Sequence, residues 1–397
     1  MSERLAIDGG RPVRTTPLPY GRQSVSEEDV RAVVEALRSD WLTTGPRVAE
    51  LEQRFAAVTG SRFAVAVSSG TAALHAAMHG LKIEPGDEVV VPAMTFAATA
   101  NAVLYEGGRP IFADVDPTTL LIDPASAGAR IGSATRAIVG VDYAGQPADW
   151  AALGALARER NLRLVADACH ALGASDGGKP VGSLADVSTF SLHPVKPITS
   201  GEGGIATTDD EALATRMRVF RNHGITSDHR QRERTGEFAY EMVELGFNYR
   251  LTDLQCALGI SQLGRLDTFT ARRRALAGSY DRLLSVSDLV SPLARRPHTT
   301  HAFHLYVVQL ALERLRVDRR QVFRALRAEG IGVNVHYLPV HLHPYYRRVL
   351  GTAPGQCPVA ERAGERILTL PLFASMSETD VEDVVRALGK VLEAYRA

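Results

Sequence analysis

Between residues 60 and 170, short apolar runs alternate with segments whose apolar residues recur at helical spacing. Near-continuous apolar strands separated by helices are typical of a mainly parallel sheet with helices on both faces. Strands are predicted at 63–67, 87–92, 110–115, 137–141 and 162–166, and helices at 70–80 and 97–107. The pattern therefore predicts an α/β fold, in which ligands bind beyond the carboxyl ends of the strands.

The chain before this series is patterned differently. Residues 11–24 are rich in proline and lack periodicity, which is typical of an extended arm that needs another surface to order it. Ser26 is predicted to cap a helix that runs to about residue 39, and a second amphipathic helix is predicted at 48–59.

The chain after the series indicates a second, smaller unit. A helical stretch from 252 to at least 277 is expected to bend or break near Gly264. A strand at 306–310 and helices at 319–330 and 380–395 follow, as in an α+β domain. Because 397 residues exceed what one core usually supports, we expect three parts. They are an N-terminal arm (1–25), a large cofactor-binding domain (26–265) and a small C-terminal α+β domain (266–397).

Composition narrows the classes of partner. The 45 basic and 45 acidic residues cancel, so no overall field favours nucleic acid or an anionic membrane. Cys169, Cys256 and Cys357 are far apart and lack metal-ligand spacing, which indicates free thiols and no metal site. We find no signal-peptide pattern and no uncharged run of membrane-spanning length, so a soluble, cytoplasmic protein is expected.

Two segments suggest cofactor chemistry. The apolar run 162–168 contains Asp167 near its end, and Lys196 lies in a stretch, 191–204, that is too polar and too rich in glycine and proline for a core strand or a helix. A pyridoxal phosphate enzyme needs such a pair, because the lysine holds the aldehyde as a Schiff base and the acid keeps the pyridine nitrogen protonated. A loop lysine considered alone is usually a solvated surface charge.

A third segment, 68–74, follows the strand at 63–67 and begins a helix. Free amides at a helix start, with small residues and hydroxyls beside them, form a seat for a phosphate group. A plain capped turn explains the same residues equally simply.

Five segments in this order resemble one enzyme family. They are Ser-Gly-Thr-Ala-Ala (69–73), Pro-Ala-Met-Thr-Phe (92–96), Asp-Ala-Cys-His-Ala (167–171), His-Pro-Val-Lys (193–196) with Gly-Glu-Gly-Gly (201–204), and Gly-Phe-Asn-Tyr-Arg (246–250). Together they resemble the nucleotide-sugar aminotransferases of the DegT/DnrJ/StrS type, which are fold type I pyridoxal phosphate-dependent transferases. Segments 17–24, 40–46 and 143–149 most resemble the branch that aminates UDP-4-keto-6-deoxy-N-acetylhexosamines on the route to pseudaminic acid.

The resemblance implies roles for residues around the cofactor ring. Lys196 would bind pyridoxal phosphate covalently and later move a proton between the substrate carbon and the cofactor. Asp167 would pair with the pyridinium nitrogen, although a strand-end Asp also serves as a helix cap. Phe96 would stack on the ring or serve as a core aromatic. His170 would lie near the phenolic oxygen, or form a structural hydrogen bond.

The resemblance also implies contacts with the phosphate and the substrate. Phosphate contacts would come from Gly70, Thr71, Ala72 and Ser191, with Asn248 supplied by the partner subunit of a homodimer with shared active sites. His336 and Tyr337, at the end of a strand predicted at 331–335, would lie at the mouth of the site or be structural. Arg230 would meet a nucleotide diphosphate, although a charge run such as 228–234 is usually only solvated.

The function implied is a ping-pong transamination. L-Glutamate would convert the cofactor to pyridoxamine phosphate, which would then aminate a nucleotide-linked keto-sugar. One alternative is a dTDP-3- or 4-keto-6-deoxyhexose as the acceptor. A dehydratase of the same family lacks the Schiff-base lysine, so Lys196 argues against it. A non-catalytic regulator or structural dimer would not need both Asp167 and Lys196. The nucleotide, the stereochemistry and the choice of C3 or C4 are not determined by these residues.

Overall fold

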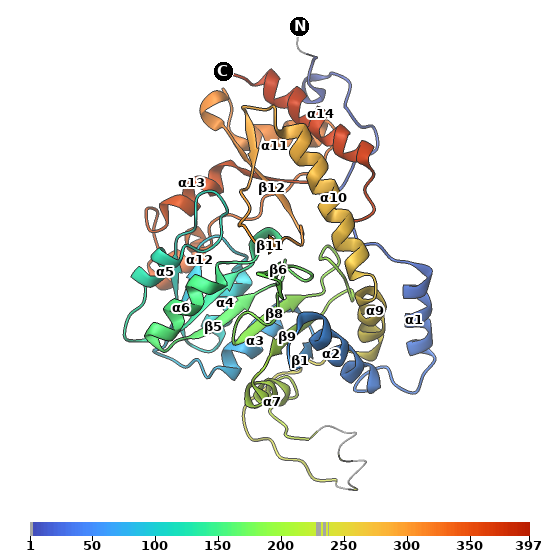
Figure 1. Cartoon of the computed structure of the whole chain (residues 1–397), viewed down its shortest axis with the longest axis vertical. Coiled ribbons are helices and arrows are strands. Elements are labelled where there is room, and N and C mark those ends of the chain that lie inside the picture. The colour runs from blue at the N-terminus through green and yellow to red at the C-terminus, as the bar shows by residue number, and fades with distance from the viewer. Residues whose placement is uncertain (1–2, 228–231, 233–235, 237) are drawn as a thin grey trace.

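A seven-stranded sheet forms the centre of the larger part of the molecule in the computed structural model, which describes residues 3–227, 232, 236 and 238–397 (Figure 1). The strand order is β1-β9-β8-β5-β4-β2-β3. Only β9 runs antiparallel to its neighbours, and all other neighbouring pairs are parallel. The strands are β1 (Phe63–Val67), β2 (Glu88–Pro92), β3 (Arg109–Ala113), β4 (Thr135–Val141), β5 (Arg163–Asp167), β8 (Val187–Ser191) and β9 (Gly204–Thr208). The predicted mainly parallel α/β sheet is confirmed.

Alternate strand residues face two separate apolar cores. Val65 and Val67 of β1 pack into one core, whereas Ala64 and Ala66 pack into the other. This alternation follows from the two-residue period of a strand, and burial on both faces makes the run apolar throughout. The first core is covered by α3 (Gly70–Gly80), α4 (Ala97–Tyr105) and α7 (Glu211–Phe220), and the second by α2 (Pro46–Thr59), α6 (Trp150–Arg160) and α9 (Asp253–Leu263).

Two central strands, β8 and β9, are absent from the elements predicted above. Their sequences, Val-Ser-Thr-Phe-Ser and Gly-Ile-Ala-Thr-Thr, contain hydroxyl residues where a core strand usually has valine or isoleucine. The threonine hydroxyls find partners inside the protein, because Thr189 donates to the Ala166 carbonyl (3.2 Å) and Thr207 to that of Gly182 (3.1 Å). Because these strands bury hydroxyl residues in place of apolar ones, a search for apolar runs does not find them.

The helix signals at the N-terminal side and at Gly264 are confirmed. Ser26 and Asp29 form a reciprocal capping box at the start of α1 (Glu27–Leu37). The long helical stretch divides at Gly264 into α9 and α10 (Leu266–Leu284).

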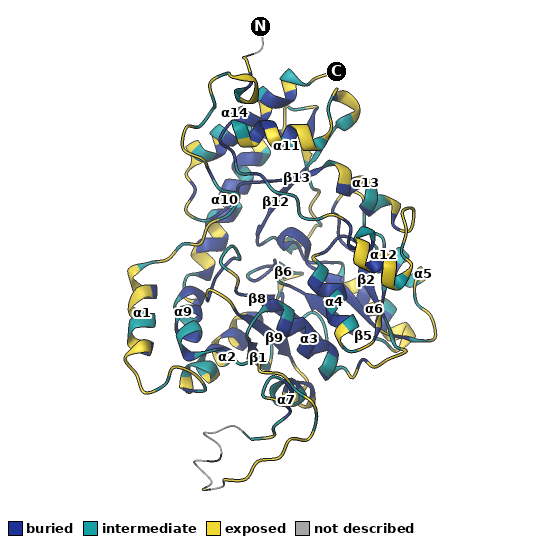
Figure 2. Ribbon diagram, turned by 180° about the vertical axis from the view of Figure 1, so that it is seen from behind, coloured by how far each residue is buried: buried dark blue, intermediate teal, exposed yellow. Residues whose placement is uncertain are grey.

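The smaller part of the molecule is built on a second sheet. Its strands are β10 (Val290–Pro292), β12 (Tyr306–Leu310) and β13 (Ile367–Leu370), flanked by α11 (Arg319–Ala328) and α14 (Glu378–Ala394). Figure 2 shows buried residues at the centre of both parts and exposed residues on their outer helices. The first turns of α10 pack on the large sheet and its later turns on the small one, so the boundary at residue 265 stays a prediction.

Short elements complete the fold. They are α5 (Pro124–Ala129), α12 (Pro344–Leu350), α13 (Pro358–Arg366), β6 (Ser175–Asp176), β7 (Lys179–Pro180), β11 (Thr299–Thr300) and the 3₁₀ turns η1 (Ala6–Asp8), η2 (Tyr143–Gly145), η3 (Leu312–Arg314) and η4 (Val340–Leu342). Within the described residues, none of the helices has the length and apolarity needed to cross a membrane.

The strand predicted at 331–335 is wrong. This segment forms only two isolated bridges, Leu18 with Ile331 and Asn334 with Thr369. The side chain of Asn334 accepts the Val335 amide (2.8 Å), which removes a donor that a strand would use. His336 and Tyr337 therefore follow an irregular segment, and the peptide bond between them is cis.

The proline-rich arm packs on the smaller part, as its sequence predicts. Glu329 is fully buried there and accepts the backbone amides of Ala6 (2.8 Å) and Val13 (3.0 Å). Its carboxylate also pairs with Lys390 of α14 at 3.0 Å. Further along the arm, Arg14 pairs with two aspartates of α14. The arm is thus ordered by charged groups that are removed from water.

We predict that Glu329→Ala lowers the free energy of unfolding by about 3–5 kcal/mol, because it leaves the buried Lys390 charge without its counter-ion and two amides without their acceptor. Urea unfolding followed by circular dichroism measures the change. Glu50→Ala is the matched control, because its ion pair with Arg54 is exposed and is worth at most about 1 kcal/mol. Equal losses in the two variants would contradict the buried-pair explanation.

Candidate active site

A cavity of about 560 Å³ opens at the carboxyl ends of the strands of the large sheet. β5 ends there at Asp167, β8 ends at Ser191, and the loop from β8 to β9 carries Lys196. The smaller part contributes the opposite wall. Of the residues selected from the sequence, the cavity is lined by Gly70, Thr71, Phe96, Asp167, His170, Ser191, Lys196, His336 and Tyr337.

Three selected residues are not among those that line the cavity. Ala72 is buried in the first turn of α3, where its amide donates to the Ser69 hydroxyl (3.1 Å). The capped turn that was one interpretation of segment 68–74 is therefore present, and it does not exclude a phosphate site at the same helix start. Asn248 lies on an exposed segment and pairs with Asn222 through one isolated bridge. Arg230 and most of the run 228–234 lie outside the described residues.

Asp167 is held in place by neighbouring hydroxyl and amide groups. Asp167 is only 6% exposed, and one of its carboxylate oxygens accepts a hydrogen bond from the Thr99 hydroxyl at 2.6 Å. Thr99 is in turn bonded to Thr95 at 2.7 Å. The other oxygen accepts the Cys169 amide at 3.3 Å. No helix begins after Asp167, so its alternative interpretation as a helix cap does not hold.

Lys196 extends from a turn closed by the bond from its own amide to the His193 carbonyl (3.0 Å). It lines the cavity and is not a solvated surface lysine. Burial lowers the pKa of its ammonium group, while Cys169 and Asp167 oppose that shift. A lysine whose pKa is lowered has a larger fraction of neutral amine, which is the nucleophilic form.

The wall opposite Lys196 contains neutral imidazoles. His170 Nε2 lies 3.0 Å from the Tyr337 hydroxyl, and its buried Nδ1 has no protein partner. His304, which the sequence did not single out, packs against His170 with ring centroids 4.5 Å apart. Burial, reinforced by the charge of Lys196, lowers the pKa of both rings well below the ordinary value. These rings therefore offer hydrogen bonds without adding positive charge.

The start of α3 and the end of β8 are closely packed against each other. A side-chain carbon built on Gly70 would lie 2.9 Å from the Cβ of Ser191 and 3.2 Å from the sulfur of Cys169. Glycine at this position therefore allows the helix start and the Ser191 side chain to approach one another. The first amides of a helix and adjacent hydroxyls are suited to a phosphate group.

The cavity fits pyridoxal phosphate by its chemistry. Lys196 supplies the amine for the aldehyde, Asp167 a carboxylate for the ring nitrogen, and the start of α3 an anion seat. Phe96, which is 58% exposed, provides an apolar wall, and the unpartnered Nδ1 of His170 leaves a polar atom available to a ligand. Across the described residues, no group of three His, Cys, Asp or Glu side chains is arranged to hold a metal ion.

Sequence reasoning missed three residues of this site. Tyr20 enters the cavity from the N-terminal arm, Thr99 orients Asp167 from α4, and His304 backs His170. Each lies far along the chain from its neighbour in space. Thr99 and His304 belong to none of the motif segments named above, and segment 17–24, which contains Tyr20, gave no role to that residue. Only the packing of the arm, the helix and the small sheet brings them together.

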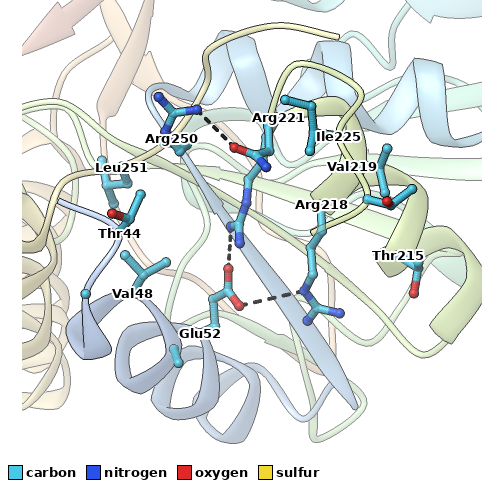
Figure 3. Close-up of a pocket in the computed structure, with 14 residues that line it drawn as sticks. Thr44, Val48, Glu52, Thr215, Arg218, Val219, Arg221, Ile225, Arg250 and Leu251 are labelled. Atoms are coloured by element: carbon cyan, nitrogen blue, oxygen red, sulfur yellow. Dashed lines mark hydrogen bonds and ion pairs between the residues drawn. The ribbon is translucent and has the colours of Figure 1, made fainter. Parts of the chain in front are cut away.

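A second cavity of about 420 Å³ lies beside the segment that carries Asn248. Figure 3 shows Glu52 between Arg218 and Arg221. Arg250 donates to the Asn222 side chain at 3.0 Å. Lys196 and Asp167 are not among the residues that line this cavity. We therefore assign the reacting groups to the larger cavity.

Comparison with known proteins gives consistent matches. The model of the DegT/DnrJ/EryC1/StrS aminotransferase family matches residues 23–389. The spore coat polysaccharide biosynthesis protein SpsC of Bacillus subtilis is 39% identical over 95% of this chain and 97% of its own.

Two solved structures share the fold over nearly their whole length. The putative sugar aminotransferase Spr1654 of Streptococcus pneumoniae, in its pyridoxal phosphate form, superimposes with a TM-score of 0.89 at 30% identity, covering 95% of this chain and 99% of that one. Helicobacter pylori PseC, an aminotransferase involved in the biosynthesis of pseudoaminic acid, gives 0.89 at 30% identity, covering 96% and 100%.

We predict that borohydride reduction in the presence of pyridoxal phosphate attaches the cofactor to Lys196, because its amine is partly neutral and lies in the cavity. Peptide mapping by mass spectrometry identifies the modified lysine. The exposed Lys82 and Lys179 are internal controls in the same digest. Label on either of them, with Lys196 unmodified, would contradict the assignment.

Proposed function

Since the chain belongs to the DegT/DnrJ/EryC1/StrS aminotransferase family of pyridoxal phosphate-dependent sugar aminotransferases, we propose that L-glutamate is its amino donor and a UDP-4-keto-6-deoxy-N-acetylhexosamine its acceptor. The main support for the proposed chemistry is that Lys196 and Asp167 line the same cavity. The choice of acceptor is supported by the likeness to PseC and by the sequence segments at 17–24, 40–46 and 143–149.

Bound pyridoxal phosphate supplies an electron sink for the carbon that gains or loses a proton. In this proposal Lys196 would bind the aldehyde and, once displaced, would move a proton between the cofactor and the carbon of the donor or the acceptor. Burial lowers the pKa of Lys196, which favours the neutral amine that a base requires. Asp167, oriented by Thr99, faces the ring nitrogen and keeps it protonated.

Other residues bind and orient in this proposal. Phe96 stacks on the ring, His170 hydrogen-bonds the phenolic oxygen, and Thr71 and Ser191 hold the phosphate. His336 and Tyr337 contact the sugar from the smaller part of the molecule. Tyr337 is already bonded to His170, so a substrate that contacts it is placed beside the cofactor.

A homodimer with shared active sites is part of the proposal. Apolar side chains along 238–247 are unusually exposed, with Phe238 at 92% and Leu245 at 77%. This segment extends below α7, away from the body of the molecule (Figure 1). A second copy of the chain would cover these side chains, and Asn248, which follows directly, would then reach the phosphate of the partner's cofactor.

We predict that the purified protein carries a visible absorption band that L-glutamate bleaches, with release of 2-oxoglutarate. Incubation with UDP- and dTDP-linked 4-keto and 3-keto sugars, followed by mass spectrometry of the product, identifies the acceptor. The expected product is a UDP-linked 4-amino sugar. Preferential turnover of a dTDP-linked sugar would show that the proposed acceptor is wrong.

The Lys196→Ala variant should turn over at least about a thousandfold more slowly than wild type while still binding the cofactor non-covalently. Substantial turnover in Lys196→Ala would refute the assignment.

We predict that inactive Lys196→Ala and weakened Asn248→Ala chains restore activity when mixed and allowed to exchange subunits. In a mixed dimer with shared sites, one site receives Lys196 from one chain and Asn248 from the other. Activity per mixed dimer should approach half that of the wild-type dimer. Each variant alone, taken through the same exchange, is the control. If activity is not restored, although differently tagged chains are shown to copurify as mixed dimers, Asn248 acts within its own chain.

A further inference from the structure

We propose that His75 positions Asn248 for the partner's cofactor by holding Tyr249, so that it serves a site it does not line. This inference rests on the proposed sharing of Asn248 between subunits. His75 lies in α3, the helix that begins at the phosphate seat, and is only 3% exposed. Its role is positioning, because it touches neither the proposed cofactor site nor the reacting groups.

Both ring nitrogens of His75 are engaged. Nδ1 lies 3.0 Å from the Tyr249 hydroxyl, and Nε2 lies 2.8 Å from one carboxylate oxygen of Glu106. The Glu106 carboxylate orients the imidazole, since a ring held at one nitrogen has its other nitrogen fixed in direction. Tyr249 therefore has a hydrogen-bond partner whose own orientation is determined.

Glu106 is itself held on its other side. Its second oxygen lies 3.2 Å from His79 Nδ1, and His79 Nε2 lies 3.3 Å from Glu244. Burial raises the pKa of Glu106, but the hydrogen bonds from His75 and His79 outweigh it and bring the pKa down to about 2. The carboxylate is therefore charged throughout the working pH range. Glu244 belongs to the same segment as Tyr249, so the network holds that segment at two points.

The backbone of Tyr249 is also fixed to the phosphate-seat turn. Its carbonyl accepts the Ser68 amide at 2.8 Å, and its amide donates to the Arg221 carbonyl at 3.0 Å. Its ring stacks on Phe247 with centroids 5.1 Å apart, and both rings pack against His75. Phe247 and Tyr249 thus anchor the two sides of Asn248.

Asn248 itself is exposed between these two anchors. Because neighbouring residues of an extended segment point to opposite sides, Asn248 points away from the cluster that holds Phe247 and Tyr249. Two residues after Asn248, Arg250 donates to the Asn222 side chain at 3.0 Å, and both residues line the second cavity. The arrangement presents one amide outward from a segment whose neighbours on both sides are fixed.

We predict that Tyr249→Phe and His75→Phe each weaken binding of pyridoxal phosphate by about tenfold, the effect of losing one positioning hydrogen bond of about 1 kcal/mol or slightly more. Both replacements retain a ring in the cluster. Binding is measured by absorbance titration of the full-length protein freed of cofactor. Pyridoxal, which lacks the phosphate that Asn248 would contact, should bind equally to wild type and variants.

Three further variants make the test specific. Tyr105→Phe removes a hydroxyl from the same ring cluster without touching the link to Tyr249, and should bind the cofactor as wild type does. His75→Asn, whose amide can replace Nδ1, should recover part of the loss. Combining His75→Phe with Asn248→Ala should cost no more than Asn248→Ala alone, because both act through one contact.

The outcomes separate this inference from the proposed function. If Asn248→Ala leaves cofactor affinity unchanged, the sharing of Asn248 is wrong. If Asn248→Ala weakens binding but Tyr249→Phe and His75→Phe do not, the positioning role is overturned. An equal loss for pyridoxal and pyridoxal phosphate would also overturn it, because general loosening of the fold would then be the cause. If His75→Phe does not fold, the Tyr249→Phe variant alone tests whether the hydrogen bond between His75 and Tyr249 positions Asn248.

Discussion

The parallel pairing of β5 between β4 and β8 is the constraint on which the active site depends. Val141 pairs with Asp167 in one direction, and Asp167 pairs with Thr189, two residues before Ser191, in the other. Parallel strands end at the same edge, so the acid, the hydroxyl and the loop that bears Lys196 emerge side by side. A shift of one residue in this register would turn Asp167 to the opposite face of the sheet.

The chemistry of the cavity follows from how its polar groups are removed from water. Asp167 keeps hydrogen-bond donors from Thr99 and Cys169, whereas His170 and His304 each bury a ring nitrogen, Nδ1, that has no protein partner. Burial lowers the pKa of Lys196 and so favours its neutral, nucleophilic form. The wall contributed by the smaller part matters here, because Tyr337 and His304 complete the burial of His170.

Helix α3 borders both the cavity and the cluster around Tyr249. Its first turn borders the cavity, and His75, one turn further on, belongs to the network around Glu106 and Tyr249. The bond from the Ser68 amide to the Tyr249 carbonyl joins the same two regions through the backbone. The start of α3 and the segment that carries Asn248 are therefore parts of one packed unit.

The sequence by itself determined the α/β class, most strand and helix positions, and the motifs that include Asp167 and Lys196. Those features depend on local periodicity or on short ordered segments, which are readable along the chain. The positions of β8 and β9 and the irregular path at 331–335 were not readable, because buried hydroxyls and the Asn334 side chain replace the usual apolar or backbone partners.

Only the tertiary structure decided which distant residues meet. Thr99 reaches Asp167 from another helix, Tyr20 arrives with an arm anchored at Glu329, and His75 meets Tyr249 across 174 positions of the chain. These contacts have no local signature, since each depends on the packing of elements that are separate in sequence. The physical reason is that a motif specifies a residue's chemistry, whereas burial and hydrogen-bond partners are specified by the folded surroundings.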